Sequence, residues 1–450
     1  MKRIVILIDG TWNRPDAENP TNVVRLSRSI LPEDKDGNVQ QVIYSPGVGI
    51  GRGNNWLARK MDRVLGGALG WGLTDIIQEA YRNLVFAYEP DDEIYIFGFS
   101  RGAFAARSLA GFIRSSGIAP RSHLKELPAA WRRYVDSERR PHPDDPKSFE
   151  FRREFAPKTA TSEKELIWRQ KAGDKDVTQL RLAYVGVWDT VKALGLPNLG
   201  DITRMFNAQY RFHDAELSSS VRSARHAIAI DELRKTFPAS PWTNIETLNR
   251  DHGAGEDKVP LYAQQWFPGN HGSVGGGGAR VGLSSVALHW IVKGAELVDL
   301  NIDWEEFDRV ANRFAPHLDD LDNKFGPTGL FAPLLNTWKL DRDGPKEVMD
   351  LSVAALDRMM HDPDYRPPTL NYVADDVANK TAAECEVMRD WMVARDGWPT
   401  HERNDRTRPR DWEPPKDARI KFPFVAPAIL KGDSNPDNTD DHGPLQAKKN

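Results

Sequence analysis

Short apolar runs alternate with polar loops and amphipathic stretches along the first 300 residues. Residues 2–8 form one such run, which ends at Asp9, and residues 93–97 form a second, which ends in a glycine-containing turn. Both are nearly continuous in apolar residues, as expected of strands buried on both faces of a parallel sheet. An amphipathic helix is expected at residues 22–31, with Thr21 as its N-cap. The alternation predicts an α/β fold with a mostly parallel, doubly wound sheet flanked by helices.

The later runs continue the alternation. We expect further strands at residues 41–44, 179–187 and 259–267, and helices at residues 56–81, 217–230, 284–297 and 303–314. Charge and proline interrupt the pattern at about residues 122–178, which we interpret as a helical insertion or cap on a core of residues 1–300. We expect residues 301–430 to form a helical C-terminal extension packed on the core. We expect residues 431–450 to form a polar, flexible tail.

Composition narrows the class of protein. The formal net charge of −4 gives no indication of the clustered basic surface that nucleic-acid binding usually requires. We therefore expect no nucleic-acid partner. The single cysteine, Cys385, excludes an internal disulfide framework. No apolar run is long enough to span a bilayer or to form a signal-peptide core. We therefore expect a cytoplasmic protein whose export, where it occurs, uses a signal-independent secretion system.

The turn after residues 93–97 reads Gly98-Phe99-Ser100-Arg101-Gly102, and a helical stretch follows it directly. A G-x-S-x-G sequence between a strand and a helix is the context of a nucleophile elbow, which presents a serine at the edge of an α/β-hydrolase sheet. Gly98 and Gly102 allow the sharp turn because a Cβ at either position would crowd the backbone. The alternative is an ordinary strand-to-helix turn with a serine N-cap. The preceding strand favours the elbow.

A serine nucleophile needs a histidine base and an acid that orients it, in the chain order Ser, Asp or Glu, His. His271 lies between the end of a predicted strand and a glycine loop, whereas most other histidines lie in polar loops or in predicted helices, as His226 and His289 do. Asp189 follows the strand at residues 179–187 and is the candidate acid. We regard Ser100, Asp189 and His271 as the candidate triad, with Asp231 and Asp299 as fallback acids.

Backbone N–H groups are expected to form the oxyanion hole. The first is that of Arg101, which follows the nucleophile, and the second comes from Gly10-Thr11, where the first strand ends. Asp9 is expected to support this loop by accepting hydrogen bonds. Asp9 also begins a sequence similar to that of aspartyl-phosphate phosphohydrolases, but Leu7 stands where those enzymes need a second aspartate. The mechanism requires neither a metal nor a cofactor.

Glycines at alternate positions offer a second competing motif. Gly49, Gly51 and Gly53 resemble a phosphate-cradling loop, yet the lysine of a P-loop and the spacing of a dinucleotide fingerprint are both missing. We interpret this segment as a flexible loop near the site.

Several motifs together resemble a known family. They are Asp9-Gly10-Thr11-Trp12-Asn13, Pro20-Thr21-Asn22-Val23, Tyr44-x-Pro46-Gly47-Val48-Gly49, Gly98-Phe99-Ser100-Arg101-Gly102-Ala103, Val185-Gly186-Val187-Trp188-Asp189-Thr190 and Trp266-Phe267-Pro268-Gly269-Asn270-His271. In this order, over residues 3–300, they are similar to an uncharacterised α/β-hydrolase domain family. Its best-known members are antibacterial phospholipase effectors of type VI secretion systems. The resemblance implies an α/β-hydrolase fold and a triad at Ser100, Asp189 and His271.

The resemblance also implies a function. A serine esterase, most directly a lipase or phospholipase, would act on an ester or phospholipid through peripheral membrane contact, and an effector would also bind a secretion apparatus or an immunity protein. Two departures weaken phospholipid as substrate: Ser273 occupies a position that is usually acidic in the family, and long C-terminal membrane-docking modules are lacking. The alternatives are a carboxylesterase on small or polymeric esters and a non-catalytic interaction module.

Overall fold

The alternating apolar runs become the strands of one parallel sheet. The computed structural model describes residues 1–10, 13–47, 68–136, 140–191, 216–234, 237–252, 259–311, 342–362 and 364–396. The sheet strands are β1 (Arg3–Ile8), β2 (Gln40–Ser45), β3 (Glu93–Phe99), β6 (Arg181–Trp188), β7 (Val221–Ala229) and β8 (Tyr262–Phe267). They lie in the order β2-β1-β3-β6-β7-β8, and every neighbouring pair is parallel. The predicted α/β class with a mostly parallel sheet is confirmed.

Both faces of the central strands are buried, which explains their continuous apolar character. In β1, Ile4, Ile6 and Ile8 enter one hydrophobic cluster, whereas Val5 and Leu7 enter another on the opposite face. This division follows the two-residue period of a strand. The two clusters are therefore separate cores that share one sheet.

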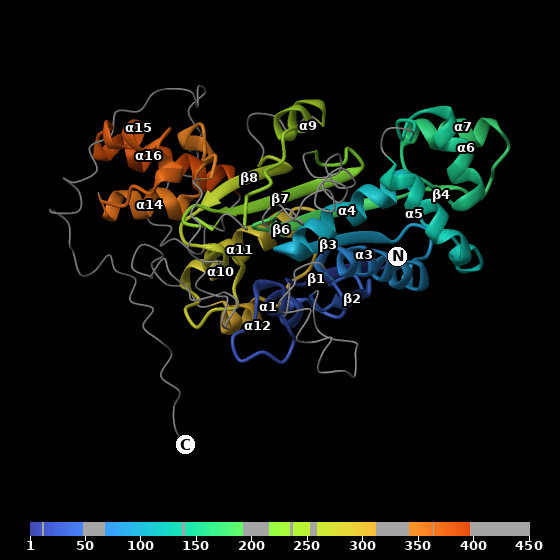
Figure 1. The fold of residues 1–450 in the computed structure, drawn as a ribbon, viewed down its shortest axis with the longest axis horizontal. Helices are drawn as coiled ribbons and strands as arrows, with labels where there is room; N and C mark the ends of the chain where they lie inside the picture. The colour runs from blue at the N-terminus through green and yellow to red at the C-terminus, as the bar shows by residue number, and fades with distance from the viewer. Residues whose placement is uncertain are drawn as a thin grey trace, which may run out of the picture.

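Helices cover each face. On the first face lie α3 (Ala68–Ala87) and α4 (Arg101–Ser116), and on the second lie α1 (Asn22–Ser29), α11 (Gly282–Glu296) and α12 (Trp304–Val310) (Figure 1). The side chain of Thr21 caps α1 by accepting a hydrogen bond from the N–H of Val24, as its sequence context predicts. The short helices α9 (Ile245–Asp251) and α10 (His271–Gly275) flank β8 in sequence.

The prediction of a helix at residues 217–230 is wrong, because this stretch forms β7, a strand with a neighbour on each side. Alanine and arginine gave it a helical composition, but tertiary context overrides so weak a preference. Polar side chains that would mark an exposed face are buried here with partners. Arg225 donates hydrogen bonds to the carbonyl oxygens of Trp290 and Asp396, each at 2.7 Å. His226 is likewise buried in a strand and not in a helix.

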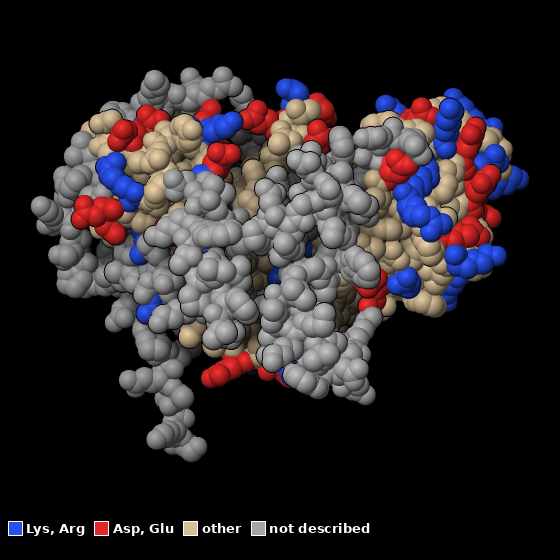
Figure 2. Space-filling view, in the orientation of Figure 1, with Lys and Arg blue, Asp and Glu red and all other residues tan. Residues whose placement is uncertain are grey.

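The charged segment at residues 122–178 folds beside α4. It comprises η1 (Arg121–Glu126), α5 (Leu127–Val135), α6 (Pro146–Phe155), β4 (Thr159–Ala160), α7 (Glu163–Lys171) and β5 (Thr178–Gln179). These helices lie at the right in Figure 1, and Figure 2 shows lysine and arginine interspersed with acidic residues on their surface. The expectation of helices is met, and β4 and β5 add a short parallel ladder that was not predicted.

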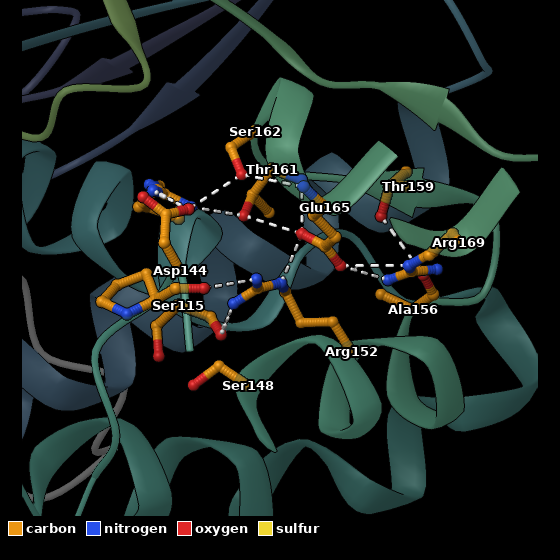
Figure 3. Close-up of polar contacts among 12 residues, drawn as sticks. Ser115, Asp144, Ser148, Arg152, Ala156, Thr159, Thr161, Ser162, Glu165 and Arg169 are labelled. Carbon is orange, nitrogen blue, oxygen red and sulfur yellow. Dashed lines mark hydrogen bonds and ion pairs between the residues drawn. The ribbon is translucent and has the colours of Figure 1, made fainter. Parts of the chain in front are cut away.

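A buried charge network holds this segment together. Glu165 lies between Arg152 and Arg169, and all three side chains are fully buried (Figure 3). Oε2 of Glu165 accepts from Nε of Arg152 at 2.8 Å, and Oε1 accepts from Nη2 of Arg169 at 2.6 Å. Arg152 also donates to the carbonyl oxygen of Ser115 on α4, at 3.2 Å. The network thus links the charged segment to the helix that follows the elbow.

Replacing Glu165 by alanine is expected to destabilise the protein strongly, because two buried guanidinium groups would lose their counter-charge. Removing one partner of a buried pair costs about 3–5 kcal/mol. Chemical denaturation measures this loss in the free energy of unfolding. The matched control is Asp174→Ala, which breaks the partly exposed pair with Arg153 and is expected to cost less than about 1 kcal/mol. Equal losses for the two variants would contradict the prediction.

The described C-terminal residues form short helices beside β8. They are η2 (Val348–Asp350), α14 (Val353–His361), η3 (Pro368–Leu370), α15 (Ala374–Ala378) and α16 (Ala382–Arg395), shown in orange and red at the left of Figure 1. A third hydrophobic cluster joins them to Ile228 in β7, to Ile230 just after it and to Trp266 of β8. Cys385 lies buried in this cluster. This end of the molecule therefore packs against the sheet edge that carries β8.

Some predicted features lie wholly or partly outside the described residues. They are the Gly49 loop, the first part of the helix expected at residues 56–81, the end of the helix expected at residues 303–314, parts of the C-terminal extension, and the tail. Of the helices in the described ranges, none combines the length and apolarity that crossing a bilayer demands.

Candidate active site

The carboxyl ends of the parallel strands meet at one edge of the sheet, the usual place for sites in such folds. Asp9 follows β1, Ser100 follows β3 and Asp189 follows β6. His271 begins α10, a few residues beyond the end of β8. The topology therefore brings to one edge four side chains that lie far apart in the sequence.

Ser100 occupies a strained backbone conformation at the junction of β3 and α4. Its φ is 60° and its ψ is −123°, a region that non-glycine residues rarely adopt. The flanking glycines allow the turn: a Cβ on Gly98 would lie 2.3 Å from the carbonyl oxygen of Gly102, and one on Gly102 would lie 2.3 Å from that of Ile8. This is the geometry of a nucleophile elbow.

Three side chains form a continuous hydrogen-bonded chain. The Nε2 atom of His271 lies 2.8 Å from Oγ of Ser100, and its Nδ1 atom lies 2.6 Å from Oδ2 of Asp189. His271 and Asp189 are fully buried, and Ser100 is 4% exposed. With Nδ1–H donating to the aspartate, Nε2 is left to accept the serine proton. The structure thus brings together the three residues of the candidate triad.

The imidazole of His271 is held on several sides. The side chain of Asn270 caps α10 by accepting from the N–H of Ser273, which sets the direction of the helix that begins at His271. The rings of Phe99 and Phe237 pack against the imidazole with centroid distances of 4.6 and 4.8 Å. This packing restricts the ring to the orientation that reaches both Ser100 and Asp189.

Asp189 is surrounded by donors. Its Oδ1 atom accepts from the N–H of Ala229 at 2.9 Å and from Nη1 of Arg342 at 2.7 Å. Its Oδ2 atom accepts from Nη2 of Arg342 at 3.0 Å, in addition to the bond with His271. Asp189 adopts a positive φ of 36°, so its backbone, like that of Ser100, is strained where it carries a site side chain.

Opposing effects set the protonation of this pair. Burial disfavours the aspartate charge, yet the Arg342 guanidinium and His271 hold the pKa of Asp189 well below its usual range. Burial lowers the pKa of His271, and the hydrogen bond and charge of Asp189 only partly offset this effect. His271 is therefore neutral at pH 7, the form that a general base needs.

Two further polar residues hold the backbone around the triad. Glu232 accepts a hydrogen bond from the N–H of His271 at 3.3 Å and pairs with Arg234. His226 accepts from the N–H of Thr190 through Nε2 at 3.2 Å, next to Asp189 in the chain. Burial lowers the pKa of His226 to about 3, so its imidazole is neutral and serves as a hydrogen-bonding partner.

The fallback acids occupy other places. Asp231 accepts from the N–H of Gly269 at 2.6 Å and from the hydroxyl of Tyr365 at 2.8 Å, and so supports the turn before His271. Asp299 lies in an exposed ion pair with Arg222. His271 hydrogen-bonds to Asp189, in keeping with the first choice of acid.

The proposed oxyanion donors differ in availability. Arg101 is the first residue of α4, where backbone N–H groups have no acceptor within the helix. The N–H of Gly10 instead donates to Oδ1 of Asp9 at 2.7 Å, so the expectation that it faces the oxyanion is corrected. Thr11 lies outside the described residues. Gly10 still borders the nucleophile, since a Cβ there would lie 3.3 Å from Cβ of Ser100.

Asp9 is a buried acceptor in the described structure. Besides Gly10, it accepts from the hydroxyls of Thr21 and Tyr44, each at 2.9 Å. Burial raises the pKa of Asp9 to about 6, and these hydrogen bonds only partly oppose the shift. No group of three or more histidine, cysteine or acidic residues within the described ranges is placed to hold a metal ion.

The raised pKa of Asp9 predicts a pH dependence of stability. The folded protein binds this proton more tightly than the unfolded chain, so the contribution is complete below pH 4 and lost as pH rises through about 6. The free energy of unfolding of the wild type should therefore fall by about 2 kcal/mol relative to that of Asp9→Asn between pH 4 and 7. Urea titrations at several pH values test this. Parallel curves for wild type and D9N would contradict it, and Asp16→Asn, at an exposed site, is the control.

Comparison with known proteins identifies the family. The family model described as "T6SS, Phospholipase effector Tle1-like, catalytic domain" matches residues 2–294. The chain belongs to this Tle1-like family. An uncharacterized protein of Saccharomyces cerevisiae, YEL023C, is 28% identical over 243 residues, which are 52% of this chain and 32% of the relative. The chain thus matches about a third of that relative's length.

Two solved structures are also similar to the Tle1-like chain. One, titled as an uncharacterized protein from Pseudomonas aeruginosa, has 17% identity and a TM-score of 0.37 and covers 88% of this chain and 60% of its own. The other, titled as the Tle1 effector bound to the VgrG spike of the type 6 secretion system, has 19% identity and a TM-score of 0.30. It covers 62% of this chain and 51% of its own. By the family match, residues 2–294 correspond to the catalytic domain that the Tle1-like model describes.

Sequence reasoning missed three site residues. Arg342 lies in a polar stretch, Leu340-Asp341-Arg342-Asp343-Gly344, that carries no recognisable motif. Phe237 lies in a loop, where an aromatic residue gives no signal of its own. Glu232 follows Asp231 one position further from the preceding apolar run, and an acidic residue there carries no distinct signal. Each of the three is positioned by tertiary contacts with His271 or Asp189.

Proposed function

We propose that the protein is a serine hydrolase that cleaves the carboxylic esters of phospholipids by acyl transfer. The observation that carries the proposal is the hydrogen-bonded chain from Ser100 through His271 to Asp189, built on an elbow with a positive φ. Membership of the Tle1-like phospholipase effector family supports the lipid substrate. An oriented base beside a serine is what nucleophilic catalysis requires.

The mechanism follows from the atoms in contact. Nε2 of His271 removes the proton from Oγ of Ser100 as this oxygen attacks the ester carbonyl. The N–H of Arg101, at the N-terminus of α4, donates to the developing oxyanion, and a second donor comes from the loop that contains Thr11. His271 then gives its proton to the departing alcohol. Water, activated by the same imidazole, releases the fatty acid and restores Ser100.

Partners and location belong to the same proposal. As a member of an effector family, the protein would reach its lipid by peripheral contact with a membrane and would leave its cell through a secretion apparatus. An effector that degrades lipid also requires an immunity protein in the producing cell. These roles need no signal peptide.

Hydrolysis of two substrate series tests the proposal. We expect free fatty acid and lysophospholipid from vesicles of phosphatidylethanolamine and phosphatidylglycerol, and faster cleavage of p-nitrophenyl esters as the acyl chain lengthens. Cleavage of short p-nitrophenyl esters with intact vesicles would favour a carboxylesterase. If no ester were hydrolysed in a Ser100-dependent way, the proposed activity would be contradicted. The remaining interpretation would then be a non-catalytic interaction module.

A further inference from the structure

Arg342 reaches the acid of the candidate triad from beyond the family's catalytic-domain match, which ends at residue 294. Its guanidinium binds both carboxylate oxygens of Asp189, at 2.7 and 3.0 Å, and its side chain is almost fully buried. Two parallel N–H···O bonds are the strongest and most directional arrangement for an arginine and a carboxylate. The contact is therefore a fixed part of the site.

The same guanidinium also ties Asp189 to its surroundings. Nη1 donates to the carbonyl oxygen of Ala229, at the end of β7, at 2.9 Å, and Nη2 donates to that of Phe237 at 2.7 Å. The ring of Phe237 packs on the imidazole of His271. One side chain thus fixes the acid, a strand end and a ring that orients the base.

The backbone near Arg342 is itself closely packed. A Cβ added to Gly344 would lie 1.6 Å from the carbonyl oxygen of Thr369, so this turn fits directly against η3. Nearby, the N–H of Ser352 donates to the carbonyl oxygen of Trp266 at 2.9 Å. The C-terminal helices therefore anchor the segment that presents Arg342.

The ion pair with Arg342 changes how strongly Asp189 stabilises the protonated form of His271. In a Ser-His-Asp arrangement the aspartate stabilises the imidazolium that forms during reaction. Here Oδ2 of Asp189 is shared between His271 and Arg342, so part of its charge is already compensated. His271 is consequently less easily protonated than it would be beside an unpaired aspartate.

Other charged and titratable groups also face His271. Glu232, after β7, favours its protonation, and Arg234, paired with Glu232, opposes it. His226, on β7, remains neutral and adds no charge. Glu232 and Arg234 carry opposite charges and are paired with each other, so Arg342 acts on His271 through the carboxylate that the two residues share.

We propose that Arg342 is a positioning residue that holds Asp189 for His271 and, by sharing the aspartate's charge, keeps the base unprotonated to lower pH. The residue belongs to the hydrolase site put forward above, so its kinetic effect rests on the proposed function. Its effect on the titration of His271 does not. The C-terminal segment is accordingly part of the site as well as part of the fold.

Titration of His271 by NMR tests the proposal without requiring turnover. Protein labelled with ¹³C at histidine Cε1, in the Ser100→Ala background, is titrated with and without Arg342→Met. We expect the midpoint of His271 to move up by about one pH unit in R342M, because the imidazolium regains the full aspartate charge. Arg342→Gln, which keeps a polar side chain at this position but loses the charge, should shift it in the same direction and covers the case in which R342M does not fold.

Two further variants separate charge from structure. Arg342→Lys keeps the cation and should leave the midpoint close to that of the parent protein. Arg389→Met breaks the ion pair with Asp357 inside the same C-terminal segment and should not move it. In the protein with Ser100 intact, the acid limb of kcat/KM should move up by the same amount in R342M and R342Q.

The outcomes are distinct. An unchanged midpoint in folded R342M or R342Q overturns the role of Arg342, even in an active enzyme. An equal shift in R389M also overturns it, because the effect would then reflect general loosening of the segment. A shift specific to R342M and R342Q supports it, even in a protein that hydrolyses no ester, where the proposed function fails.

Discussion

Replacing Ser100 by alanine is expected to lower kcat for ester hydrolysis by about a millionfold, because no other group at the elbow can form the acyl intermediate. The fold should remain, since Ser100 is a small side chain on a backbone held by Gly98 and Gly102. The positive φ of 60° is retained at some cost by alanine as by serine. Steady-state kinetics on a p-nitrophenyl ester measures the loss.

A matched serine on the same helix provides the control. The hydroxyl of Ser115, in the last turn of α4, makes no hydrogen bond within the described residues, so Ser115→Ala should keep activity within about twofold. Residual turnover in S100A above about one per cent of the wild-type rate would show that another nucleophile is at work. Equal losses in S115A and S100A would point to damage of α4.

Asp189→Asn is expected to lower kcat by about 10⁴-fold, the effect of presenting the base with an amide where it needs a carboxylate. The amide N–H would face Nδ1 of His271 and so favour the tautomer whose Nε2 carries a proton, which cannot accept from Ser100. The same change leaves the buried Arg342 without its counter-charge, which should cost about 3–5 kcal/mol in the free energy of unfolding. Kinetics and urea denaturation are measured on the same preparation.

A second variant provides the control for both the loss of kcat and the loss of stability. Asp299→Asn, at an exposed ion pair, should leave both kcat and the free energy of unfolding nearly unchanged. If Asp189→Asn lowered stability but preserved kcat, Asp189 would be a partner of Arg342 alone, and the triad assignment would fail.

Much of the sheet could be predicted because its strands are buried on both faces. The runs at β1 and β3 are apolar at nearly every position, and the turn at Ser100 has its glycines at the required spacing. His271 and Asp189 could be selected because each comes just after an apolar run. The pattern of apolar residues was sufficient to predict these strands because burial on both faces of the sheet produces that pattern.

β7 and the environment of Asp189 could not be predicted, for a related reason. Arg225 and His226 are polar residues buried in a central strand, and their burial depends on partners from α11, β8 and the C-terminal segment. Arg342 binds Asp189 across 153 positions in the sequence. Pairings of this kind carry no periodic signal, and they become visible only when the chain is folded.

The ion pair between Arg342 and Asp189 has a consequence for biosynthesis. Ser100, Asp189 and His271 are all translated before Arg342, and domains begin to fold as the chain emerges from the ribosome. Until the segment with Arg342 has been made, the nascent sheet carries an aspartate whose principal cation is missing. The contacts around Asp189 are therefore complete only after residue 342 has been translated, so assembly of the candidate site is a late event in synthesis.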